Sequence, residues 1–179
     1  MIRTLMAGAV LALATVPGAA LAQEGAKYDC VVTTATPNLK AQIGGAMTGQ
    51  GDDASREALF KQLGELVDGC VTRHGIGEAN KGNYFDYSLA RISREWLIGD
   101  ISKQGLSVAP VDKAMDFGLG KTNPDLSGEM SQDQIMSIVQ AYIDSGVNIE
   151  KVDQSVWEKV GAYAAATSIY WNKRKTLTF

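Results

Sequence analysis

Residues 160–171 read VGAYAAATSIYW, a stretch of twelve positions without a charged side chain. At helical spacing, Trp157, Gly161 and Trp171 fall on one stripe of this stretch and its N-terminal flank. A helix that is uncharged all round is contacted on most sides, and its small residues let neighbouring helices approach closely. We therefore expect a long central helix over residues 153–173, ending at a Lys-Arg-Lys cluster that suits the helix C-terminal dipole.

The rest of the chain favours further helices joined by loops. Apolar residues recur at helical spacing over three segments, 54–72, 84–98 and 131–145, and shorter helices are expected over 37–47 and 112–117. The β-branched run Val31-Val32-Thr33-Thr34 predicts a short strand within residues 29–36. Period-two alternation does not recur, which disfavours a β-sandwich or a barrel. The predicted fold is therefore all-α, a single domain of four to six helices in an orthogonal or bundle-like arrangement.

The first 22 residues have the features of a secretory signal peptide. Arg3 supplies a positive charge, residues 5–16 form a short apolar region, and Ala20-Leu21-Ala22 is a small-x-small cleavage site. A membrane anchor is the alternative, but the apolar region is too short and too rich in alanine and glycine for one. We expect a mature chain of residues 23–179 that forms one helical domain without a further transmembrane segment. It is predicted to be exported to the periplasm, with the extracellular medium as the alternative.

The interpretation of the two cysteines, Cys30 and Cys70, depends on this predicted export. Cysteines in an oxidising compartment usually pair, and these two do not form a C-x-x-C redox motif. The alternative is two free thiols. We predict a structural Cys30–Cys70 disulfide.

Composition excludes several kinds of chemistry. The chain has 17 basic and 20 acidic residues and a net charge of −3, which provides no basic footprint for nucleic acid. Its single histidine, His74, excludes any site that needs two. Residues 118–122, Gly-Leu-Gly-Lys-Thr, end like a phosphate-binding loop but lack that motif's first glycine and a preceding strand, so they are interpreted as an ordinary loop. No residue spacing selects a catalytic group, and no cofactor is expected.

The segment 123–134 resembles an EF-hand calcium loop. Its oxygen-bearing side chains fall at loop positions 1, 3, 5 and 9, with a glycine at position 6; they are Asn123, Asp125, Ser127 and Glu129. Position 1 lacks the usual Asp, and Gln134 at position 12 cannot offer a bidentate carboxylate. The alternative is a loop that ends in a capping box between Ser131 and Gln134, which needs no metal.

A second candidate site lies at the start of the helix expected over residues 84–98. Tyrosine and arginine are common in protein interfaces, and here they cluster with a phenylalanine as Tyr84, Phe85, Tyr87, Arg91 and Arg94. An exposed aromatic patch would make this segment an interface. The alternative is that the aromatic side chains pack into the core.

A third candidate is an apolar ligand groove on the last helix. Trp157, Gly161 and Trp171 share one stripe, so the two indoles could line a groove whose floor is made by small residues. The alternative is that this stripe is core, with its small residues admitting a crossing helix.

Three functions follow from these features. The first is an exported, non-enzymatic helical protein that binds another protein or an envelope component. The second is a binder of a small ligand or of calcium, through the core groove or the 123–134 loop. The third is a hydrolase with acidic catalytic residues, for which the sequence selects no particular pair.

Overall fold

The computed structural model describes residues 17–177, which contain seven α helices, one short 3-10 helix and no strand. In chain order the elements are α1 Pro17–Thr34, α2 Pro37–Ala46, α3 Asp53–His74, α4 Glu78–Lys103, α5 Ala109–Ala114, α6 Gln132–Asp144, η1 Ile149–Lys151 and α7 Gln154–Thr176. The predicted all-α class is confirmed. The helix count exceeds the expected four to six because α1 occupies the segment for which no helix was predicted.

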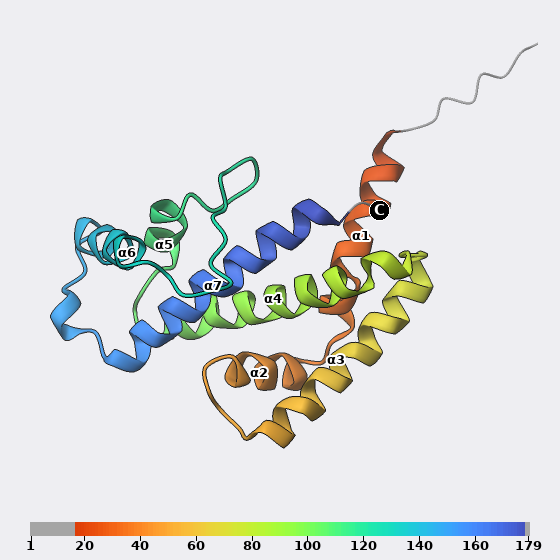
Figure 1. The fold of residues 1–179 in the computed structure, drawn as a ribbon, viewed down its shortest axis with the longest axis horizontal. Helices are drawn as coiled ribbons and strands as arrows, with labels where there is room; N and C mark the ends of the chain where they lie inside the picture. Colours follow the sequence, from red (N-terminus) through yellow and green to blue (C-terminus); the bar gives the residue numbers. More distant parts are fainter. Residues whose placement is uncertain (1–16, 178–179) are drawn as a thin grey trace, which may run out of the picture.

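Helices α4 and α7 form the centre of the molecule (Figure 1). They run antiparallel, because Tyr87 near the start of α4 stacks on Tyr170 near the end of α7, and Asp100 near the end of α4 pairs with Lys159 near the start of α7. The uncharged stretch predicted to be central is buried as expected, with Ala164 fully enclosed. This pair is the frame on which the other helices assemble.

Two apolar clusters of buried side chains lie along this central pair of helices, one toward each end. One is formed by α1, α2, α3, the first half of α4 and the end of α7. The other is formed by α5, α6, the loop between them, the second half of α4 and the first half of α7. The small helices α5 and α6 thus lie at the opposite end of the pair from α1 and α3 (Figure 1).

The predicted strand in residues 29–36 is wrong, because α1 is helical through Thr34. Cys30 and Val31 are buried against the first cluster, and Cys30 is bonded to Cys70 of α3 with a Cα–Cα distance of 5.9 Å. Packing of one apolar helical face outweighs the modest local preference of β-branched residues for strands. The predicted Cys30–Cys70 disulfide is confirmed.

The predicted signal peptide stays a prediction. Residues 1–16 lie outside the described part of the chain, and α1 spans the predicted cleavage point after Ala22. None of the helices within residues 17–177 combines the length and the apolar character needed to cross a bilayer.

At Gly44, α2 lies close against α4, and this glycine provides a test of the packing. A Cβ at Gly44 would overlap the indole ring of Trp96 on α4. We expect Gly44→Ala to lower the free energy of unfolding by about 1–3 kcal/mol, because the indole must move. The matched control is Gly69→Ala on α3, which has open space around it and should raise that free energy by about 0.5–1 kcal/mol. Urea unfolding checks both, and an unchanged or higher stability of Gly44→Ala would contradict the packing described.

Candidate functional site

An apolar pocket opens where α6, η1 and the first half of α7 meet. Its volume is about 290 Å³, and we call it the α6–α7 pocket; it is lined by Met130, Ile135, Ile138, Val139, Ile149, Trp157, Val160 and Gly161. No lining side chain is charged. The pocket is therefore suited to an apolar group rather than to a charged or strongly polar one.

The local sequence fixes the geometry of this pocket. Helix α6 begins with the predicted capping box: the Gln134 amide N–H donates to Ser131 Oγ, and the Ser131 amide N–H donates to Gln134 Oε1 at 2.8 Å. This cap sets where α6 starts and hence which of its residues face α7. Trp157 is held edge-on against Tyr142, with ring centroids 5.3 Å apart. Gly161 has no side chain, which leaves space in the pocket beside Met130.

Helix α6 also exposes apolar side chains next to the pocket. Met136 is 52% exposed, and Ile135 and Ile143 are exposed as well. On the other side of α6 a larger, open groove of about 780 Å³ separates it from α5, with Lys113 and Asp144 among its lining residues. Large apolar side chains left exposed together on one short helix are typical of an interaction surface.

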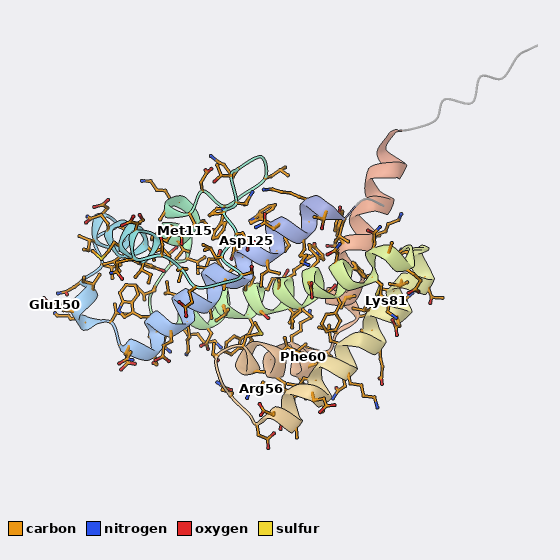
Figure 2. All side chains as sticks on the ribbon, viewed as in Figure 1. Arg56, Phe60, Lys81, Met115, Asp125 and Glu150 are labelled. Carbon is orange, nitrogen blue, oxygen red and sulfur yellow. A yellow bond between two sulfur atoms is a disulfide. The ribbon has the colours of Figure 1, made fainter. Side chains whose placement is uncertain are left out.

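Most residues that line the α6–α7 pocket come from an acidic segment of the chain. Residues 129–158, the acidic segment, contain six carboxylates and one lysine, a net charge of −5; the carboxylates are Glu129, Asp133, Asp144, Glu150, Asp153 and Glu158. All six are exposed, and none forms an ion pair with a side chain of residues 25–177, although the charge of Lys159 acts on Asp153. Three of them directly adjoin lining residues in the chain, namely Glu129, Glu150 and Glu158. Figure 2 shows Glu150 at the end of the molecule where α6 and η1 lie.

The structure separates the three residues of the predicted groove. Trp157 and Gly161 line the α6–α7 pocket, whereas Trp171 packs edge-on against Tyr170, with ring centroids 4.8 Å apart. Trp171 lines a different cavity, under the loop that contains Leu119. Ten residues of helix separate Gly161 from Trp171, a rise of about 15 Å, which is too far for one pocket of this size.

The predicted interface at residues 84–94 belongs largely to the core. Tyr84 and Tyr87 are 0% exposed, which corrects the expectation that they form a surface patch, and Phe85, Arg91 and Arg94 are only half-buried. The Tyr84 hydroxyl donates to the carbonyl of Lys27 at 2.6 Å, so its polar end is satisfied inside the protein. Burial raises the pKa of the Tyr84 phenol to about 12. These tyrosines stabilise the contact of α4 with α1 and α7 rather than presenting a surface.

The residues of the calcium-like loop make local hydrogen bonds. Asn123 is 2% exposed, and its amide donates to the carbonyls of Gly118 and Lys121 at 2.8 and 2.9 Å. Asp125 accepts from the Ser127 amide at 2.9 Å, and Gln134 belongs to the capping box. Glu129 is exposed. Among the side chains of residues 25–177, no group of three His, Cys, Asp or Glu residues is placed to hold a metal ion. Local hydrogen bonding therefore accounts for this segment without a cation.

A half-buried polar network links α4, α5 and α7. The Tyr163 hydroxyl donates to Asp112 Oδ1 at 2.8 Å and accepts from Arg94 Nη2 at 3.2 Å. Burial raises the pKa of the Asp112 carboxyl. A hydrolase with a pair of acidic residues needs a second carboxylate beside the first. The direct partners of Asp112 are instead Tyr163 and Arg94. The network holds three helices together.

Sequence reasoning missed most of the α6–α7 pocket and its acidic surroundings. The signal was available in the clustering of six acids within 30 residues, which the whole-chain charge of −3 conceals. Comparison with protein-family models, curated proteins and solved structures found no match to this chain.

Proposed function

We propose that this protein is an exported, non-catalytic binding protein whose α6–α7 pocket takes an apolar side chain from a positively charged segment of another protein. One observation carries the proposal: the lining of an uncharged pocket adjoins three exposed carboxylates, Glu129, Glu150 and Glu158, none of which forms an ion pair within residues 25–177. An anchor side chain in a pocket supplies affinity, and complementary charge around it supplies specificity and a fast association rate.

The charge of the acidic segment and the size of the pocket distinguish this partner from the alternatives. An anionic envelope surface would be repelled by the acidic segment, whereas a basic protein segment would be attracted. A volume of about 290 Å³ suits one or two apolar side chains better than a complete small-molecule ligand. The proposed export rests on the predicted signal peptide, and the disulfide suits an oxidising compartment.

The test is calorimetric titration with a synthetic amphipathic helix that carries leucines on one face and lysines on the other. We expect one saturable site, with affinity that falls as salt rises from about 0.05 M to about 0.5 M, because charge attraction is screened. The same peptide with glutamates in place of the lysines, and vesicles of anionic lipid, should not bind. Binding of the glutamate peptide or of the vesicles would contradict the proposal.

Charge reversal at the pocket provides the matched comparison. The double variant Glu129→Lys, Glu158→Lys should weaken binding of the lysine peptide about three- to tenfold, on the scale of a few exposed charge pairs. The control is Glu57→Lys, Glu65→Lys on the exposed side of α3, which changes the net charge equally. Equal weakening by both variants would show that only overall charge matters and would contradict a site at the α6–α7 pocket.

A further inference from the structure

The loop of residues 116–123, which follows α5, presents a single leucine to solvent. Leu119 is 83% exposed, the largest exposed fraction among the large hydrophobic side chains of residues 25–177 that are exposed. Figure 1 shows the loop after α5 projecting outward from the helices. One exposed leucine is unremarkable by itself, so its surroundings decide whether it has a role.

The loop that carries Leu119 is held in one conformation. The Gly118 amide donates to Asn123 Oδ1 at 2.8 Å, and the Thr122 amide donates to Asp116 Oδ2 at 2.9 Å. The backbone adopts positive φ at Asp116 and Asn123, +47° in each, and at Gly118 and Gly120. A side chain held at the tip of an ordered loop loses less conformational entropy on docking than one on a flexible segment.

Basic residues surround Leu119. Arg174 and Lys175 line the same cavity as Leu119, and Lys175 Nζ donates to the Thr122 carbonyl at 3.2 Å. Lys121 lies two positions along the loop, where it pairs with Asp116 at 3.3 Å, so the three cations and this one carboxylate leave a net charge of +2. The tip therefore combines an exposed apolar side chain with a positive surround, which is the chemistry that the α6–α7 pocket and the acidic segment are built to accept.

We propose that a second copy of this chain is a partner of the α6–α7 pocket, with Leu119 of one copy inserted into the pocket of the next. The exposed Lys121 and Lys175 then face the acidic segment of the neighbour, while the half-buried Arg174, which stacks on Tyr28, adds to the positive potential behind them. This inference rests on the proposed function, because it identifies one occupant of the same pocket. The two surfaces are different, so the contact is heterologous, and it builds open chains or a closed ring rather than a two-fold dimer.

Two variants divide the contact into its halves. Leu119→Asp removes the inserted side chain, and Gly161→Leu fills the pocket; Leu119→Met and Gly69→Leu are their controls. In sedimentation equilibrium over a concentration series, the average mass of the unmodified chain and of both controls should rise with concentration. Leu119→Asp alone and Gly161→Leu alone should stay monomeric, with self-association weakened at least about tenfold.

An equal mixture of the two variants gives the decisive result. In this mixture the Gly161→Leu chain keeps an intact loop tip, and the Leu119→Asp chain keeps an intact pocket. One contact can therefore form, and the mixture should give a heterodimer and nothing larger. If Gly161→Leu does not fold, Ile135→Asp, which puts a charge into the pocket lining at a position that is already 39% exposed, replaces it as the pocket variant. A mixture that stays monomeric, or Leu119→Asp that self-associates like the unmodified chain, would overturn the proposal.

Peptide titration separates the two proposals. Leu119→Asp should bind the lysine peptide at least as tightly as the unmodified chain, because its pocket is intact. An unmodified chain that stays monomeric up to about 1 mM, a concentration that reveals contacts worth about 4 kcal/mol, yet binds the peptide would overturn self-association and leave the proposed function standing. A chain that neither self-associates nor binds the peptide would overturn both.

Discussion

Raising the pH from about 10 to about 12 is expected to unfold the protein cooperatively. Burial raises the pKa of Tyr84, Tyr142 and Tyr163 from the ordinary 10.0 to about 12. The folded protein then keeps protons that the unfolded chain releases, so stability is fully present below pH 10 and falls as the pH rises toward 12. Each tyrosine contributes about 2–3 kcal/mol to this loss, and the three together approach the whole stability of an ordinary domain.

Far-UV circular dichroism and tyrosinate absorbance, followed together, check this prediction. Loss of helix and ionisation of the buried phenols should coincide in one transition. Tyr142→Phe should make the fall in stability with pH shallower by about 1.4 kcal/mol per pH unit, since one titrating group is gone. Ionisation of all tyrosines near pH 10 with the helical signal unchanged would contradict the buried tyrosine cluster.

Removing the disulfide is expected to cost about 4 kcal/mol of stability. Cys30 and Cys70 are separated by 40 positions, and a crosslink over such a loop restricts the unfolded chain by that order. The variant Cys30→Ser, Cys70→Ser should therefore unfold at a clearly lower urea concentration than the unmodified chain. Reduction of the unmodified chain should have the same effect, and it should have none on the variant.

The loss should begin at α1. This helix is bonded to α3 through Cys30, whereas α6 lies in the other apolar cluster. Hydrogen exchange should accelerate in residues 25–34 of the variant under conditions where α6 and the first half of α7 keep their protection. An unchanged urea midpoint, or acceleration confined to α6, would contradict the structural role assigned to the disulfide.

The helices that could be predicted are those whose signals are local. The capping box at Ser131 places the start of α6, and the uncharged stretch 160–171 identifies α7 as central. Helix α1 could not be predicted, because its β-branched residues prefer strands locally and become helical through packing on other helices. Helix α4 continues past Gly99, where we expected it to end, because Ile101 is fully buried in the next turn.

The candidate site was only partly predictable for a similar reason. Trp157 and Gly161 could be assigned to a groove from one helical stripe, but a stripe does not tell where along the helix a neighbour ends. For this reason the stripe wrongly suggested that Trp171 shares the groove, whereas Trp171 lies outside the pocket. Tyr84 and Tyr87 suggested a surface because composition alone cannot distinguish an aromatic interface from an aromatic core. Their burial depends on α1 and α7, which are distant in sequence.

The measurement that tests the central claim most directly is calorimetric titration of the lysine peptide into Gly161→Leu and Gly69→Leu in parallel. Both substitutions put a leucine in place of a helical glycine, but only Gly161 lines the α6–α7 pocket. We predict that Gly161→Leu abolishes binding while Gly69→Leu binds like the unmodified chain. Equal binding by a folded Gly161→Leu variant would contradict the claim that this pocket receives the partner's apolar side chain.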